Sequence, residues 1–185
     1  MLSDYNLYYI IIPICSVVLL SWILMYAVTD SGPSDKLDLT DPDTHIVITG
    51  GSSGIGLTTA LSLRSKGCSV TIIARNKAKL EEAKADVDSK TVGKAGKLYI
   101  MSADVSNKEQ IEEAINLSAT QHNNRIDALI ASAGITRPGR FEDVEISMFE
   151  KMMQINYLGV VYTTLAVLPY MKKQLRGRVL YVSSD

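Results

Sequence analysis

The sequence predicts a doubly wound α/β domain, a parallel sheet covered by helices on both faces, preceded by one transmembrane helix. Two patterns predict the domain: from residue 45 onward short apolar runs alternate with longer segments of helical periodicity, and a glycine-rich loop follows the first run. An uncharged run near the amino terminus predicts the membrane helix. We therefore divide the chain into a tail (1–6), an anchor (7–28), a linker (29–44) and a partial Rossmann-type domain (45–185).

The anchor is predicted from residues 7–28, which contain 22 residues without a charged side chain. As a helix rising about 1.5 Å per residue, this run spans a hydrocarbon core of about 30 Å. Aromatic side chains crowd its two ends, as they do at membrane interfaces: Tyr5, Tyr8, Tyr9, Trp22 and Tyr26. A cleaved signal peptide is the alternative, but residues 1–6 lack Lys and Arg.

Residues 29–44 are polar and acidic and are interrupted by Gly32, Pro33 and Pro42, which predicts a linker. Lys36 is the nearest basic residue to the apolar run. An excess of positive charge marks the cytoplasmic flank of a membrane helix, so Lys36 favours a cytosolic location for the larger domain.

Composition excludes several classes of protein. The chain has 185 residues and a net charge of −1, too short for two full domains and without the basic field that nucleic-acid binding needs. Cys15 and Cys68 lie in very different segments, so a disulfide framework is not expected. His45 and His122 have no partners at ligand spacing, so no metal site is expected.

Five runs rich in aliphatic and β-branched residues are too short for buried helices and are predicted to be strands. They are residues 45–50, 68–75, 97–105, 126–134 and 177–184. Alternation of strands and helices implies right-handed crossovers and a parallel sheet. The last strand is expected to form an uncovered, apolar edge of an incomplete sheet.

Between the strands, apolar residues recur on single helical faces. The three stripes are Leu80, Ala83 and Val87; Ile111, Ala114 and Ile115; and Phe149, Met152, Met153 and Asn156. Asn156 is expected to be buried and to need a backbone carbonyl or a bound water as partner. Capping-box spacing at Ser106 with Glu109, and at Ser147 with Glu150, predicts two helix starts.

The loop "GGSSGIG", from Gly50 to Gly56, joins the first strand to the first helix. Its glycines are expected to provide a tight turn, a close backbone approach and close helix packing. Free N–H groups of this loop and of the helix start would then face a pyrophosphate. The residues predicted to bind a dinucleotide here are Gly50, Ser52, Ser53, Gly54, Ile55 and Gly56.

The second strand ends in "ARN", with Arg75 and no acidic residue from residue 68 to residue 80. A site for NAD would place Asp or Glu here to bind the ribose 2′-hydroxyl, whereas arginine accommodates a 2′-phosphate. The sequence therefore predicts NADP(H), with Arg75, Lys77 and the Ser52 and Ser53 hydroxyls meeting the phosphate. The alternative is that Arg75 is a solvated charge at a strand end.

Five features of the sequence carry a resemblance to a known family: "TGGSSGIG", "ADV" at 103–105, "ASAG" at 131–134, Asn156 and "GRVLYVSS". By these features the chain beyond about residue 45 resembles the short-chain dehydrogenase/reductase family. The resemblance implies that Asp104 and Val105 flank the adenine and that Ala133 and Gly134 run beside the cofactor. It also implies that Asn156 belongs to the catalytic relay. The family's usual asparagine pair is here Ala131–Ser132, which weakens bracing of the sheet.

In that family a serine at the end of the last strand, here Ser184, hydrogen-bonds the substrate carbonyl while a tyrosine donates the proton. Tyrosine and a lysine four residues later would follow on the next helix. No Tyr-x-x-x-Lys occurs in this sequence, and Tyr170 with Lys172 and Lys173 has the wrong spacing. Little or no activity is therefore expected of the 185-residue chain, which we interpret as a fragment or an alternatively terminated form.

The most specific part of the resemblance is residues 140–162. They resemble membrane-anchored members of the family that reduce long-chain keto lipids in sphingolipid synthesis. This implies a location in the endoplasmic reticulum membrane, with the main domain facing the cytosol and the substrate arriving from the bilayer. Sterol or retinoid dehydrogenases are alternatives, as is a non-catalytic module that binds NADP(H) or a protein partner. A lumenal domain is a further alternative, which sugar on Asn116 would indicate. A homo-oligomer also remains open.

Overall fold

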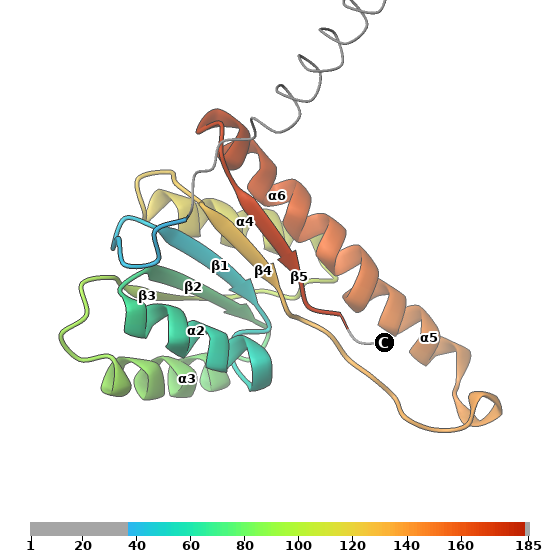
Figure 1. Ribbon diagram of the computed structural model, residues 1–185. Helices are drawn as coiled ribbons and strands as arrows, with labels where there is room; N and C mark the ends of the chain where they lie inside the picture. Colours follow the sequence, from blue (N-terminus) through green and yellow to red (C-terminus); the bar gives the residue numbers. More distant parts are fainter. Residues whose placement is uncertain (1–36, 184–185) are drawn as a thin grey trace, which may run out of the picture. The chain divides into compact units, whose positions relative to one another are not determined.

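Five parallel strands form one sheet in the order β3-β2-β1-β4-β5 (Figure 1). The structure, a computed structural model, describes residues 37–183. The strands are β1 His45–Thr49, β2 Ser69–Ala74, β3 Leu98–Ser102, β4 Ala128–Ala131 and β5 Arg178–Tyr181. The five predicted strands and their parallel arrangement are confirmed, each strand being shorter than its apolar run.

Helices connect these strands and cover the two faces of the sheet. They are α2 Gly54–Lys66, α3 Lys77–Lys90, α4 Lys108–Thr120, α5 Ile146–Met152 and α6 Gly159–Lys173. A 3₁₀ turn, Phe141–Asp143, precedes α5, and a π-helical turn, Met153–Leu158, joins α5 to α6. Within residues 37–183 no helix has the length and apolar character needed to cross a bilayer. The expected anchor over 7–28 lies outside the described residues.

Alternate residues of β1 enter two separate cores, which explains the layered arrangement. Ile46 and Ile48 pack in the core that includes residues of α2 and α3, whereas Val47 packs with residues of α4 and α6. Successive side chains of a strand point to opposite faces, so a strand buried on both faces is predominantly apolar, as the three central residues of β1 are. Figure 1 shows α2 and α3 on one face of the sheet and α4 and α6 on the other.

Strand order places a crevice at the carboxyl end of β1. The chain runs outward from β1 to β2 and β3, then crosses back to add β4 and β5 on the other side. Connections that leave neighbouring strands toward opposite faces open a gap at the strand ends, and ligands of doubly wound sheets bind there. The residues that follow β1, β2, β3 and β4 therefore meet at one edge.

Both predicted capping boxes are wrong. Asn107 caps α4, its side-chain oxygen accepting from the Gln110 backbone N–H at 2.9 Å. The Ser106 hydroxyl donates instead to Asp104, at 2.7 Å. Helix α5 begins after Glu145, which makes no side-chain cap, so Ser147 lies inside the helix.

His45 begins a chain of hydrogen bonds at the amino end of the sheet. Its Nδ1 lies 2.6 Å from the Arg125 carbonyl oxygen, which can only accept, so Nδ1 carries the proton. In the neutral ring Nε2 then accepts from the Thr71 hydroxyl at 2.8 Å, and Thr71 accepts from Ser118 at 2.8 Å. Burial of the ring lowers the pKa of His45 from its ordinary 6.5 to about 4.

Stability is expected to fall as the pH falls from about 6.5 to about 4, because the unfolded chain binds a proton at His45 that the native ring does not. The lost stabilisation amounts to about 3 kcal/mol by the pKa difference. Urea denaturation at several pH values checks this. In His45→Gln the free energy of unfolding is expected to vary less with pH between about 6.5 and about 4, which means a flatter slope. An unchanged slope in His45→Gln would assign the pH dependence to other groups.

Candidate functional site: a dinucleotide cleft at the carboxyl edge of the sheet

The glycine-rich loop after β1 is pressed against the loop after β4. Gly50 has a φ of +70°, and its N–H donates to the Ile73 carbonyl of β2 at 2.8 Å. A Cβ at Gly50 would come within 2.9 Å of Ala133 backbone atoms. Only glycine therefore fits a turn that is both left-handed and in backbone contact with its neighbour.

Helix α2 starts in this loop and packs closely beneath it. A Cβ at Gly56 would lie 2.5 Å from the Gly50 carbonyl oxygen, so the absence of a side chain lets the helix approach the turn. Ser53 is the N-cap residue, and its side chain makes no hydrogen bond to the helix. The first N–H groups of a helix have no partner within it, so the start of α2 presents donors to an anion.

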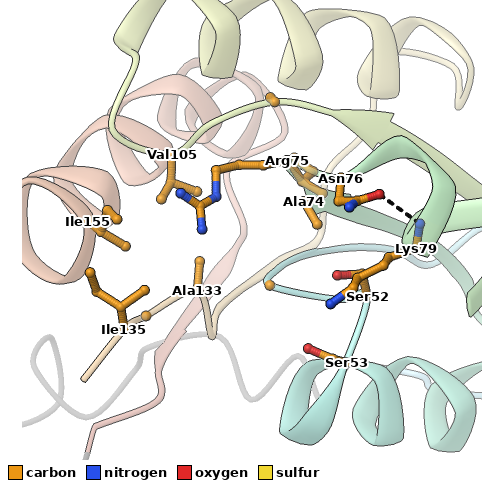
Figure 2. A pocket seen from close by; sticks show the side chains of 14 residues that line it. Ser52, Ser53, Ala74, Arg75, Asn76, Lys79, Val105, Ala133, Ile135 and Ile155 are labelled. Atoms are coloured by element: carbon orange, nitrogen blue, oxygen red, sulfur yellow. Dashed lines mark hydrogen bonds between the residues drawn. The ribbon is translucent and has the colours of Figure 1, made fainter. Parts of the chain in front are cut away.

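A cleft of about 370 Å³ opens beside the loop, shown in Figure 2. Its walls come from the segments that follow β1, β2, β3 and β4, together with the π turn, as the strand order predicts. The lining residues are Gly50, Ser52, Ser53, Ile73, Ala74, Arg75, Asn76, Lys79, Ala103, Val105, Ala133, Gly134, Ile135 and Ile155.

Seven of the twelve predicted cofactor-binding residues line this cleft, and five do not. The seven are Gly50, Ser52, Ser53, Arg75, Val105, Ala133 and Gly134. Gly54 and Ile55 are exposed at the start of α2, and Gly56 lies beneath the loop. Asp104 lines an adjoining cleft that shares Arg75, and Lys77 is exposed and lines neither cleft.

Arg75 extends across the opening toward Val105 (Figure 2). Its Nη1 lies 3.8 Å from Oδ2 of Asp104, and its side chain is 54% exposed. Burial raises the pKa of Asp104, but hydrogen bonds from the Ser106 hydroxyl and backbone N–H and the nearby Arg75 cation lower it more, so the pKa lies below its usual value. Asp104 is therefore a fixed, ionised partner that already engages Arg75.

Lys79 is a charged residue of the cleft that the sequence did not indicate, and it lines the cleft where Lys77 was expected. The Asn76 side-chain oxygen accepts from the Lys79 backbone N–H at 3.0 Å, which fixes the first turn of α3 (Figure 2). Asn76 is thus the N-cap, and the third residue after it points into the cleft. Recognising Asn76 as a cap would have placed Lys79 in the first turn, since caps accept from the second or third helical residue.

Six other lining residues are missing from the prediction: Ile73, Ala74, Asn76, Ala103, Ile135 and Ile155. All but Asn76 are apolar side chains in segments recognised for other reasons, and their sequence carries no signal of a cleft. Ala133 is held in place by Thr49, whose hydroxyl accepts from the backbone N–H groups of Ser132 and Ala133 at 3.2 Å each. Thr49 thus ties β1 to the loop after β4, next to the Ala131–Ser132 pair that was expected to weaken bracing of the sheet.

Asn156 clamps the loop after β4 to the π turn. Its Oδ1 accepts from the Ile135 N–H at 2.9 Å and its Nδ2 donates to the Ile135 carbonyl at 2.8 Å. The expected backbone carbonyl partner is confirmed, but the expected burial is wrong, since Asn156 is exposed and Ile155 is the buried residue of the turn. The π turn shifts the helical face by one residue relative to the predicted stripe.

Ser184 lies outside the described residues, so its predicted contact with a substrate stays a prediction. Ser183, its neighbour in the sequence, is exposed just beyond β5.

These features fit a dinucleotide. The turn at Gly50 and the open start of α2 suit a pyrophosphate, and cationic side chains lie where a ribose would follow. The apolar side chains of Ala103 and Val105, with only 3% and 6% of their surface exposed, form a wall on which a flat base can pack. The residues present therefore fit the pyrophosphate and the adenosine half of a dinucleotide.

The comparisons with known proteins agree with this geometry. Residues 44–185 match the family described as short chain dehydrogenase. The 3-ketodihydrosphingosine reductase of Bos taurus is 40% identical over 144 residues, which are 78% of this chain and 43% of that protein. The chain thus spans less than half the length of this curated relative.

Solved structures share the fold over the same region. Levodione reductase matches with a TM-score of 0.72 and 30% identity, covering 77% of this chain and 54% of that one. An alcohol dehydrogenase from Thermococcus sibiricus, complexed with 5-hydroxy-NADP, matches with a TM-score of 0.70 and 29% identity over 77% of this chain and 58% of that one. The resemblance inferred from the glycine loop and the later motifs is confirmed, and the chain belongs to the short-chain dehydrogenase family.

Proposed function

We propose that this chain carries the cofactor-binding part of a membrane-anchored, NADPH-dependent ketoreductase that reduces 3-ketodihydrosphingosine (3-ketosphinganine) to sphinganine. The observation that carries the cofactor choice is the charge at the end of β2. Arg75 and Lys79 line the cleft there, and residues 68–80 contain no carboxylate to bind a ribose 2′-hydroxyl. Two cations in a cleft whose lining includes no carboxylate suit a 2′-phosphate better than a hydroxyl.

Each part of the cleft has a defined task in this proposal. The N–H groups at Gly50 and at the start of α2 would hold the pyrophosphate, and Val105 would pack against the adenine. Ala133 and Gly134 would run along the nicotinamide half. When bound, NADPH supplies the hydride that reduces a ketone.

The chain's own polar groups would handle the substrate oxygen and the proton. Ser184 would donate a hydrogen bond to the carbonyl oxygen, where negative charge develops during reduction. Asn156 would keep the loop at Ile135 at the correct distance from the nicotinamide ring. Its side-chain amide hydrogen-bonds both the N–H and the carbonyl oxygen of Ile135. Both roles are proposals for the intact reductase.

The choice of substrate is supported by the name and 40% identity of the Bos taurus relative. A long-chain keto lipid partitions into bilayers, so an anchor over residues 7–28 would raise its local concentration at the cleft. We place the protein in the endoplasmic reticulum membrane with this domain in the cytosol, where NADPH is available. A homo-oligomer is compatible with this arrangement. Keto sterols and retinoids are the alternative substrates against which 3-ketodihydrosphingosine must be tested.

Binding measurements with the full 185-residue chain in detergent test the cofactor proposal. We expect NADPH to bind at least about tenfold more tightly than NADH, since one charge-assisted contact to the 2′-phosphate contributes about that much. Titration calorimetry measures both dissociation constants. Equal affinities, or tighter binding of NADH, would contradict the proposed cofactor.

Turnover by membranes that contain the full-length gene product tests the substrate. Conversion of 3-ketodihydrosphingosine to sphinganine with loss of NADPH, detected by mass spectrometry, is expected, with a keto sterol as the comparison substrate. Reduction of the keto sterol but not of 3-ketodihydrosphingosine would show that the proposed substrate is wrong. Cofactor binding without any reduction would indicate a non-catalytic module instead.

A further inference from the structure

We propose that the amino edge of the sheet, the edge at which its strands begin, is a surface that binds anionic lipid headgroups through the segments before β2, β3 and β5. This inference rests on the proposed anchor over residues 7–28 and adds to it the face of the domain that meets the bilayer. The dinucleotide cleft lies at the opposite, carboxyl edge and would stay open to water.

Exposed lysines gather at the amino edge because all five strands are parallel (Figure 1). Helices α2, α3 and α6 end there and lead to Lys66, Lys94, Lys97, Lys172 and Lys173, all exposed. Within residues 37–183 no carboxylate forms an ion pair with these side chains. Cations in a last helical turn also stabilise the helix, but Lys94 and Lys97 lie beyond the end of α3. Their charges are therefore available to an anionic surface.

Two of these segments also carry an apolar side chain that is almost fully exposed. Val92 lies between α3 and β3, two residues before Lys94, and is 83% exposed. Leu175 lies between α6 and β5, two residues after Lys173, and is 88% exposed. Apolar side chains flanked by lysines are typical of segments at a membrane interface, where the apolar atoms enter the acyl boundary and the cations meet headgroups.

The backbone at Leu175 gives this exposure a functional meaning. Leu175 has a φ of +55° and directly follows Gln174, the C-cap residue of α6. The position after a C-cap commonly holds glycine when the backbone is left-handed, because a Cβ is strained there. A leucine that is both strained and exposed contributes little to folding, so contact with a surface outside the domain is the better explanation for it.

Residues 37–44 fix the chain to the amino edge just before β1. The Cys68 thiol, before β2, donates to the Leu39 carbonyl oxygen at 2.9 Å. Nε2 of His122, before β4, lies 3.0 Å from the Asp43 carbonyl oxygen. The chain therefore reaches the domain at the edge that carries the lysines.

The length of chain before Leu37 keeps this edge close to the proposed anchor. Residues 29–36 separate Leu37 from the apolar run that ends at residue 28. A segment of this length spans at most about 28 Å even when it is fully extended. The amino edge is thus the part of the domain that such a tether would hold nearest to the headgroups.

Carboxylates in the same segment oppose the lysines only in part. Oδ1 of Asp38 accepts from the N–H and the hydroxyl of Thr40, at 2.8 and 2.7 Å. Asp41 accepts from the Asp43 N–H at 2.9 Å and lies 4.0 Å from Nη2 of Arg125. Asp38 and Asp41 are thus already engaged, whereas the lysines of this edge have no acidic partner among the described residues.

Fluorophores at single cysteines of the full 185-residue chain test the surface. The chain carries Cys15→Ser, and Cys68 is buried and should stay unlabelled. Nanodiscs of phosphatidylcholine with about 30% phosphatidylserine carry nitroxide-labelled headgroups as quenchers. We expect labels at Val92→Cys and Leu175→Cys to lose at least about half of their emission relative to discs without nitroxide. A label at Phe141→Cys, exposed beyond the carboxyl end of β4, should lose less than about a tenth.

Charge reversal distinguishes headgroup binding from mere nearness to the disc. Lys94→Glu combined with Lys173→Glu should restore at least about half of the emission lost at Leu175→Cys. The matched control, Lys77→Glu with Lys108→Glu, makes the same charge change at the carboxyl edge, at helix starts where a carboxylate is tolerated, and should restore none. Discs of phosphatidylcholine alone, or about 0.5 M salt, should act like the first variant. Thermal unfolding verifies that each variant is folded.

The outcomes separate this inference from the proposed anchor. A chain that does not enter the discs would overturn the anchor and the inference together. A chain held in the discs whose labels at residues 92 and 175 keep their emission would overturn the inference alone, as would quenching at residue 141 instead. Quenching that persists through charge reversal, neutral lipid and high salt would also overturn it, because headgroup charge would then not be what the edge binds.

Discussion

Gly56→Ala is expected to abolish detectable NADPH binding and to lower the free energy of unfolding by about 2–3 kcal/mol. The new methyl carbon would stand 2.5 Å from the Gly50 carbonyl oxygen and 2.9 Å from its carbonyl carbon. Both obstructing atoms are backbone, so no side-chain rotation relieves the overlap. The start of α2 must move away from the loop, and with it the N–H groups that would hold the pyrophosphate.

Gly93→Ala is the matched control for this substitution. Gly93 has a φ of +80°, and no atom lies within 4 Å of the position that a Cβ would take, so alanine there suffers only backbone strain of about 1–2 kcal/mol. Urea denaturation and NADPH titration of the two variants separate strain from overlap. Wild-type NADPH affinity in Gly56→Ala would show that the loop does not need close contact with the helix.

Asp127→Ala is expected to destabilise the domain by about 3–5 kcal/mol, the usual cost of removing one partner of a buried ion pair. Asp127 is 1% exposed. Its Oδ2 accepts from the His45 backbone N–H at 2.9 Å and from Arg125 Nε at 2.7 Å. Arg176 Nη2 lies 3.3 Å from Oδ1, an ion pair that lacks the alignment of a hydrogen bond.

Loss of this carboxylate would affect several segments at once, because it joins the start of β1 to the turns before β4 and β5. The control is Asp86→Ala, which removes an exposed carboxylate paired with Lys90 one helical turn away. That change should cost no more than about 0.5 kcal/mol. Equal losses in the two variants, measured by urea denaturation, would contradict the importance given to Asp127.

The fold could be predicted because its strands are buried on both faces. In β1 all five residues are buried, and its three consecutive aliphatic residues, Ile46, Val47 and Ile48, followed by glycines indicate a central parallel strand without any knowledge of its neighbours. Helix starts were less predictable. Ser106 has the right spacing for a capping box, but Asp104 competes successfully for its hydroxyl, and a spacing rule contains no information on such competition.

Site residues that act through the shape of the backbone could be predicted from the sequence. Residues whose role depends on the direction of the side chain were harder to predict. The loop from Gly50 to Gly56 follows from glycine placement alone. Lys79 was missed because the helix start at Asn76 was not recognised. Lys77 and Lys79 lie two residues apart, so their side chains leave the helix in directions about 200° apart. Asn156 was assigned to the right partner type but the wrong environment, because the stripe assumed regular α-helical periodicity.

The π turn at Met153–Leu158 has a consequence for how this helix tolerates change in length. A π turn holds about one residue more than an α turn, so it resembles an insertion accommodated within a continuous helix. Loss of that residue would let the backbone relax to regular geometry while rotating every later side chain about the axis. The extra residue therefore sets how the side chains of α6 are rotated about the helix axis relative to those before it. With this rotation Asn156 faces the loop at Ile135 while Val167 and Met171 lie in the core.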